Sequence, residues 1–282
     1  MHGFSDRFIA SGRSVDILLA NAGVIASPLT RVGPGWESQF ATNHLGHFAL
    51  ANLLWPALTS GGGRVISVSS RGHKASGIRW DDLQFERDYD KWKAYGQAKT
   101  ANVLFAVQLD KLAAPHGVRA FSVYPGGIQT PLQRHLDHDE MVRLGWFDRD
   151  GNTSVDWKSP EHGAATSAWA ATSPQLTGIG GVYCEDCDVA EVDTGTGEGK
   201  GRGVSPWAID PDQAARLRDV SARLTGSTRS LRADMPACPQ LYAGTYRPIT
   251  TGVPSGSVFT AVMAAAVSRT QPCEMAPLWA AS

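Results

Sequence analysis

The chain has 282 residues, of which 42% are hydrophobic and 19% charged, and its formal net charge at pH 7 is −1. This length allows one large domain or two small ones, with ample apolar content for a core. The small net charge gives no bulk attraction to nucleic acid or to an anionic membrane, so neither is expected as a partner. No signal peptide opens the chain, and its longest uncharged apolar run near the end, 257–267, is far shorter than the ~20 residues that span a bilayer. We therefore expect a soluble, cytoplasmic protein.

The cysteines and the clustered histidines give no strong metal signal. Four cysteines in a chain of this length do not make a disulfide framework. The segment 184–187 has CxxC spacing, which suits a redox pair or half of a zinc site, but a structural zinc site needs four ligands. We read this pair as small residues flanking a strand end. His44 and His47 have no evident carboxylate partner, and a catalytic zinc needs three protein ligands. No metal is expected.

The first part of the chain predicts strand, helix and strand in turn. Residues 16–20 form a short apolar run that stops at a turn, which is typical of a buried strand. Residues 36–58 carry a helical pattern that ends near Pro56 and the glycine run 61–63. A second strand is predicted at 65–70. A polar loop leads from it to the next element.

The middle of the chain continues this alternation. A long amphipathic helix is predicted at 92–112 and a third strand at 118–124. The polar and charged segment 128–155 is consistent with a mobile lid over a site.

The last predicted elements are two helices and a strand. Ser159 followed by Pro160 is a helix start, and this helix is expected to run to about residue 172. A short strand at 180–184 and a helix at 211–224 complete the set. Strands and helices in alternation predict a parallel sheet with right-handed crossovers, and therefore an α/β fold.

The composition changes after residue 225. Charged residues become sparse, lysine disappears, and Pro, Ser, Thr and Gly are scattered without a period of 3.6 or 2. We expect a domain at 1–225 and a disordered or adventitious tail at 226–282. A reading-frame change is one origin of such a tail.

Tyr95 and Lys99 are the most informative pair in the sequence. Four residues apart on one helix, they lie about 40° apart around its axis, so both side chains reach one spot. A phenol loses its proton near pH ~10, and a neighbouring ammonium lowers that pKa. A hydroxyl at the end of the preceding strand, that of Ser70, would hold a carbonyl oxygen beside the phenol. This arrangement predicts a proton-transfer site and makes oxidoreduction the first hypothesis.

Five motifs in a fixed order resemble the short-chain dehydrogenase/reductase family over roughly residues 16–225. They are Asn21-Ala22-Gly23, Asn43 in the sequence ATNHLG, Ser70, the YxxxK pair Tyr95 and Lys99, and Pro125-Gly126-Gly127-Ile128-Gln129-Thr130. The segments 80–85 and 96–105 are similar to retinol-dehydrogenase-like and WW-domain-oxidoreductase-like members. The resemblance implies a Rossmann-like, doubly wound parallel sheet.

The resemblance also implies roles for the catalytic residues. Tyr95 would be the general acid in reduction and the base in oxidation, and Lys99 would lower its pKa and bind the nicotinamide ribose. Ser70 would donate to the substrate oxygen, and Asn43 would hold a water that relays protons from Lys99. Each residue also has a plain structural role open to it: an interfacial aromatic for Tyr95, a strand-end cap for Ser70, a backbone contact for Asn43.

The cofactor implied by the family is NAD or NADP. The turn Asn21-Ala22-Gly23 would line its adenosine side, and Tyr95 and Lys99 would meet its nicotinamide end. The last motif would border the nicotinamide through Pro125, Gly126, Ile128 and Thr130.

We expect the family's phosphate-binding motif TGxxxGxG, which belongs on the turn after the first strand, to be absent. The glycine-rich stretches 61–63 and 195–203 do not follow a strand and open a helix, as pyrophosphate binding requires. We therefore expect an N-terminally truncated, incomplete domain in which the strand at 16–20 is an exposed edge. The residue that selects NAD or NADP cannot be read.

Two functions are weighed on this basis. The first is an NAD(P)-dependent enzyme that interconverts an alcohol and a carbonyl, with a homodimer formed through the helices of Asn43 and Tyr95. The alternative is a non-catalytic remnant that cannot bind dinucleotide and acts, if at all, as a binding or oligomerisation module. An epimerase or dehydratase is a weaker third hypothesis.

Overall fold

The computed structural model describes residues 1–195 and 201–227. Its main sheet has the strand order β1-β4-β5-β6-β7. The strands are β1 (Ile17–Ala20), β4 (Arg64–Val68), β5 (Arg119–Tyr124), β6 (Val182–Glu185) and β7 (Asp188–Val189). The first four are parallel and β7 is antiparallel to β6. The α/β fold with a mainly parallel sheet is confirmed. The tail expected from residue 226 lies, apart from its first two residues, outside the described part.

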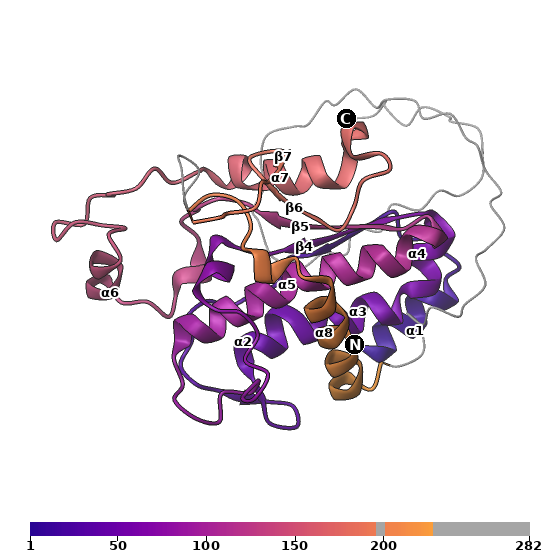
Figure 1. Cartoon of the computed structure of the whole chain (residues 1–282), viewed down its shortest axis with the longest axis horizontal. Helices are drawn as coiled ribbons and strands as arrows, with labels where there is room; N and C mark the ends of the chain where they lie inside the picture. The colour runs from indigo at the N-terminus through magenta and orange to yellow at the C-terminus, as the bar shows by residue number, and fades with distance from the viewer. Residues whose placement is uncertain (196–200, 228–282) are drawn as a thin grey trace, which may run out of the picture.

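Helices cover both faces of this sheet (Figure 1). One face carries α1 (His2–Ala10), α3 (Gly46–Leu53), α4 (Trp55–Gly61) and α5 (Lys91–Ala113), with α8 (Pro211–Thr225) packed on α5. The other face carries α7 (Pro160–Thr172). Successive residues of a strand point to opposite faces, so Val65 joins the first core and Ile66 the second. Burial on both faces explains why the predicted strands are continuous apolar runs.

The segment predicted as one helix, 36–58, is divided in the structure, and that prediction was wrong at both ends. Trp36–Glu37 is a short strand, β3, paired with β2 (Arg31–Val32). The chain then forms α2 (Ser38–Phe40), a π-helical turn at Ala41–Leu45 and α3.

Two local causes explain this division. The Glu37 carboxylate accepts hydrogen bonds from the backbone N–H groups of Gln39 and Phe40, which fixes the helix start there. Pro56 lies in the first turn of α4, where its missing N–H costs nothing, so it follows a helix start instead of ending a helix.

The other predicted elements lie close to their expected limits. The helix predicted at 92–112 is α5, capped by the Asp90 side chain, and Ser159 caps α7 through the N–H of His162. The strand predicted at 65–70 ends at Val68, so Ser70 lies in the loop beyond it. The segment 128–155 contains a short helix, α6 (His138–Arg143).

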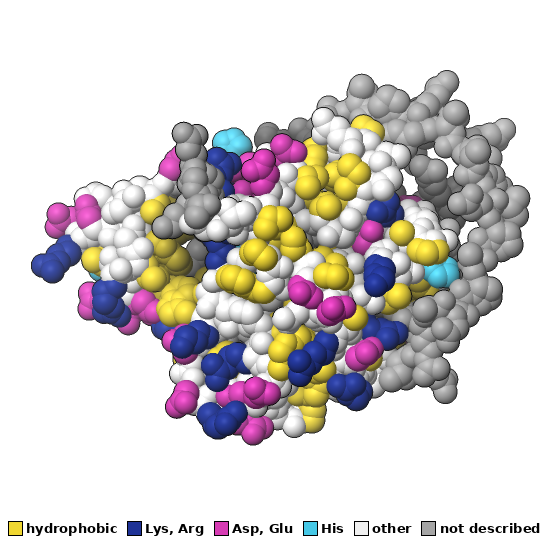
Figure 2. Space-filling view, in the orientation of Figure 1, with side chains coloured by type: hydrophobic (Ala, Val, Ile, Leu, Met, Phe, Trp, Pro, Cys, Tyr) yellow, Lys and Arg dark blue, Asp and Glu magenta, His cyan; other side chains and the backbone are white. Residues whose placement is uncertain are grey.

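Charged side chains of both signs alternate on the face shown in Figure 2, without a broad area of one sign, which agrees with the net charge of −1. No helix in residues 1–195 or 201–227 combines the length and apolar character needed to cross a membrane.

Candidate active site

The predicted site residues gather at the carboxyl ends of three neighbouring strands. The turn Asn21–Gly23 follows β1, Ser70 follows β4 shortly after its end, and the loop from Pro125 follows β5. In parallel sheets these strand ends share one edge, which is where such folds bind their ligands. The helix α5 packs against β4 and β5 and brings Tyr95 and Lys99 to the same region.

Ser70, Tyr95 and Lys99 come together as the motif spacing predicted. The Lys99 Nζ lies 5.7 Å from the centre of the Tyr95 ring, and both residues are 5% exposed. The Ser70 hydroxyl is near enough to the phenol to lower its pKa by hydrogen bonding. Its Oγ also accepts a hydrogen bond of 3.0 Å from the N–H of Gly72. The cluster therefore holds a phenol, a hydroxyl and an ammonium in one buried place.

The pKa of Tyr95 differs from the expected direction. Burial raises it to about 12, and the hydrogen bond from Ser70 offsets only part of that rise. The expected lowering by Lys99 is not found, because the ammonium lies over the ring and donates to the Val68 carbonyl at 2.9 Å. Desolvation of the phenolate is the larger effect. At neutral pH the phenol therefore carries its proton.

Replacing Lys99 with methionine is expected to stabilise the fold at pH 7 by about 2 kcal/mol, because folding buries a charge with a single polar contact. Burial lowers the pKa of Lys99 from 10.5 to about 8, so between these values the unfolded chain binds more protons. Wild-type stability should therefore rise as the pH increases through this window, and the methionine variant should lack that rise. Urea unfolding across the window measures both effects.

The Val68 carbonyl would not be left unpaired in this variant, since it also accepts 2.8 Å from Asn102 Nδ2. A lower stability at pH 7, or an unchanged rise with pH, would contradict the expectation.

Asn43 clamps the loop that follows β1. Its Oδ1 accepts from the Val24 N–H at 2.8 Å, and its Nδ2 donates to the Val24 carbonyl at 3.0 Å. A Cβ on Gly23 would lie 3.2 Å from the same Oδ1, so the close approach favours glycine there. The side chain thus makes the backbone contact that was the plain structural reading. The Asn43 carbonyl oxygen lies 2.8 Å from His47 Nδ1.

The loop after β5 is half-buried and has a backbone turn that requires glycine. Pro125, Gly126 and Ile128 are half-buried, and Gly126 has a φ of 98°, which only glycine adopts without strain. Thr130 caps the following short turn in a capping box with Gln133. Thr130 therefore shapes this loop by a bond within the chain.

The sequence analysis did not identify His73, whose side chain hydrogen-bonds the backbone of Ser70. Its ring is fully buried, with Nδ1 2.7 Å from the Ser70 carbonyl oxygen and Nε2 accepting from the Ser205 N–H at 3.0 Å. Because Ser205 must donate, the proton lies on Nδ1. Burial lowers the pKa of His73 to about 4, so the ring is neutral at pH 7. Its nearness to Ser70 in sequence was the only available signal.

His44 and His47 bind different partners. His44 Nε2 lies 2.7 Å from the Ser221 hydroxyl of α8, whereas His47 contacts Asn43. Burial lowers the pKa of His44 to about 3 and that of His47 to about 4, so both are neutral at pH 7. Among residues 1–195 and 201–227, no three His, Cys, Asp or Glu side chains are grouped as metal ligands.

The CxxC pair spans the end of β6. Cys184 lies in the strand and Cys187 in the turn before β7. Burial raises the pKa of the Cys184 thiol to about 12, which makes it a poor nucleophile.

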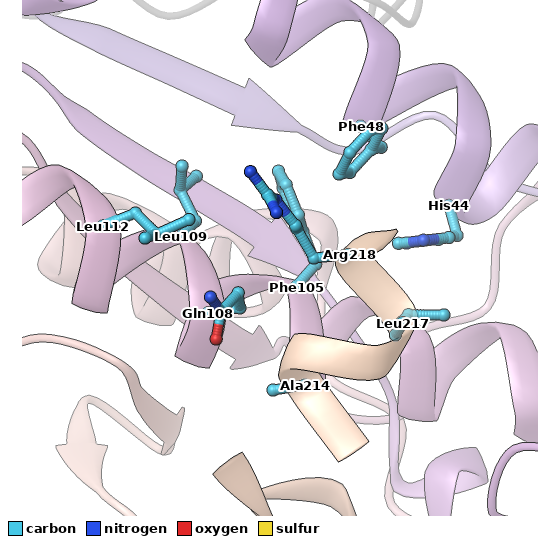
Figure 3. Close-up of a pocket in the computed structure, with 9 residues that line it drawn as sticks. All are labelled: His44, Phe48, Phe105, Gln108, Leu109, Leu112, Ala214, Leu217 and Arg218. Carbon is cyan, nitrogen blue, oxygen red and sulfur yellow. The ribbon is translucent and has the colours of Figure 1, made fainter. Parts of the chain in front are cut away.

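A small apolar hollow, lined in part by His44, lies between α3, α5 and α8 (Figure 3). Phe48, Phe105 and Leu217 are among the side chains around it, and Tyr95, Ser70 and Lys99 are not. We do not assign it to the reaction.

The described residues fit the nicotinamide end of a dinucleotide. A buried lysine, a phenol and a hydroxyl lie together beyond the end of β4, and the left-handed Gly126 follows the neighbouring strand β5. Among residues 1–195 and 201–227, the pyrophosphate end has no such match. The expected absence of the motif was wrong for the sequence itself, because residues 194–201 spell TGxxxGxG, but in chain order they follow β7 and not a first strand.

A parallel sheet covered on both faces, with serine, tyrosine and lysine grouped near its carboxyl edge, is the arrangement that the sequence resemblance led us to expect. A family model described as "short chain dehydrogenase" matches residues 3–141. A protein named "Probable oxidoreductase" from Streptomyces lividans is 44% identical over 223 residues, covering 77% of this chain and 74% of that protein. The chain belongs to the short-chain dehydrogenase/reductase family, and the predicted resemblance is confirmed.

Two further comparisons agree. Human "Retinol dehydrogenase 14" is 33% identical over 230 residues, covering 80% of this chain and 63% of that protein. The crystal structure of an uncharacterised protein from Mycobacterium paratuberculosis superimposes with a TM-score of 0.57 at 32% identity, covering 80% of this chain and 72% of that one.

Proposed function

We propose that this chain is an NAD(P)-dependent oxidoreductase that interconverts an alcohol and a carbonyl compound. The observation that carries the proposal is the grouping of Ser70, Tyr95 and Lys99 in one buried place at the sheet edge. A nicotinamide bound there would supply or accept the hydride. The turn Asn21–Gly23 and the loop from Pro125 are the segments that would hold it.

The chain's own residues would handle the proton. The Tyr95 hydroxyl would give its proton to the carbonyl oxygen in reduction and remove one from the alcohol in oxidation. Ser70 would hold the same oxygen by donating a hydrogen bond. The high pKa of Tyr95 keeps the phenol protonated at neutral pH, which is the form that can donate a proton in reduction.

Binding and turnover together test this proposal. The protein would be titrated with NADH and with NADPH, following nicotinamide fluorescence, and then assayed for loss of the reduced nicotinamide in the presence of a panel of aldehydes and ketones. We expect one of the two to bind below about 1 mM and to support turnover. If neither binds at that concentration, the remnant without dinucleotide binding is the better account.

The expected homodimer stays a prediction. One face of α5 is already covered by α8, so a dimer through α3 and α5 would use their remaining surface.

A further inference from the structure

The segment 131–157, named the lid here, lies over the Tyr95 side chain with its apolar residues. Leu136 is 8% exposed and shares a buried cluster with Tyr95, Ile25 and Ala26. The partly buried side chains packed on this cluster are Trp92, Leu132, Met141 and Trp146. The inner side of the lid therefore excludes water from the neighbourhood of the phenol.

An aromatic row extends from the helix α5 into the lid. The rings of Trp92 and Trp146 meet edge to face at 6.2 Å, and Trp146 meets Trp157 in the same way at 5.5 Å. Phe147 stacks on Trp157 at 6.1 Å. Of these contacts, the one between Trp92 and Trp146 joins the lid to the first turn of α5, and the other two hold the rings together within the lid.

Glu140, on α6, makes the polar connection between the lid and α5. Its Oε2 accepts from Lys91 Nζ at 2.5 Å, and its Oε1 accepts from Trp92 Nε1 at 3.0 Å. Its side chain is 12% exposed, so the ion pair is partly shielded from solvent. Across the described lid and α5, no other side-chain hydrogen bond or ion pair joins the two.

The place of this contact on α5 links it to the reaction centre. Lys91 and Trp92 are the first two residues of the helix, and Tyr95 lies three residues beyond Trp92, on the same side. The positive end of the helix dipole also favours a carboxylate there. Trp92 both donates to Glu140 and packs on the lid, so the polar and apolar contacts act on one side chain.

We propose that Glu140 is a positioning residue that fastens the lid to the first turn of the helix carrying Tyr95 and so keeps the apolar side chains of the lid packed on Tyr95. The catalytic consequence rests on the proposed function. With the lid fastened, a bound substrate is enclosed and water is excluded. With it released, substrate would leave sooner.

Three variants test the proposal: Glu140→Ala, Glu140→Gln and, as control, Asp139→Ala. Asp139 is an exposed acid on the same helix, so its loss changes charge without touching α5. Hydrogen–deuterium exchange of lid peptides should be about tenfold faster in Glu140→Ala, since two charge-assisted bonds are lost. The exchange rate of Glu140→Gln should lie between those of the wild type and Glu140→Ala, because its amide oxygen still accepts a hydrogen bond from Trp92. The control should match the wild type.

Steady-state kinetics give the second readout. We expect KM for the carbonyl substrate to rise about tenfold in Glu140→Ala with a smaller change in kcat. Unchanged lid exchange in Glu140→Ala, equal loosening in the Asp139 control, or faster exchange without a change in KM in an active enzyme would each overturn the proposal. If the wild type shows no turnover, the proposed function fails, and lid exchange alone then decides whether Glu140 fastens the lid.

Discussion

Replacing Tyr95 with phenylalanine is expected to lower kcat for carbonyl reduction by about a thousandfold, with nearly unchanged stability and nicotinamide binding. The change removes only the hydroxyl that we propose as the proton donor, and positioned acids contribute about 10²–10⁴-fold. The ring keeps its packing in the cluster with Ile25 and Leu136. Ser70 keeps its hydrogen bond from the Gly72 N–H, so the loop should hold its shape.

Tyr183→Phe is the matched control. The Tyr183 hydroxyl is buried and has no hydrogen-bond partner within the described residues. Without the hydroxyl, the aromatic ring can still pack against the His73 ring, whose centre lies 5.1 Å away. We therefore expect this variant to lose neither turnover nor stability. Initial rates with saturating reduced nicotinamide and urea unfolding measure both variants. Turnover retained in Tyr95→Phe would exclude the phenol as the acid.

Gly72→Ala is expected to lower kcat/KM by about a hundredfold, although Gly72 itself has no proposed chemical role. A Cβ at this position would lie 2.5 Å from Cε1 and 2.8 Å from Cδ1 of the Tyr95 ring, and 3.3 Å from Ser70 Oγ. The ring must move, and a misplacement of about 1 Å can cost that much in rate. The same overpacking should cost about 1–3 kcal/mol of stability.

Gly77→Ala provides the comparison. A Cβ there meets nothing nearer than 3.6 Å, at Trp207 Cδ1. This variant should keep its rate, as measured with the same substrate. If both alanine variants lose activity equally, the steric explanation for Gly72 is wrong.

Much of the fold follows from local patterns. Continuous apolar runs locate β4 and β5, and caps at Asp90 and Ser159 mark where α5 and α7 begin. The segment around Pro56 was misread because proline is compatible both with the end of one helix and with the first turn of the next. Periodicity alone does not separate these cases. The helix α2 begins where the Glu37 side chain caps it, and no spacing in the sequence marks this glutamate as a cap.

The site was predictable where chemistry depends on spacing within one element, and not where it depends on packing. Tyr95 and Lys99 lie on one helix, so their proximity follows from its period. His73 and Glu140 bind partners 132 and 49 residues away, which no motif records. The raised pKa of Tyr95 was missed for the same reason, because burial is a property of the assembled domain.

The placement of α8 has a consequence for how the protein is made. Its Ser221 meets His44 across 177 residues of chain, and its Ala214 and Leu217 complete an apolar cluster with Ala101 and Leu104 of α5. On the ribosome, the helices that carry Asn43 and Tyr95 emerge long before α8. The apolar surface that α8 covers therefore stays exposed until α8 has been made, which makes this surface prone to aggregation during synthesis.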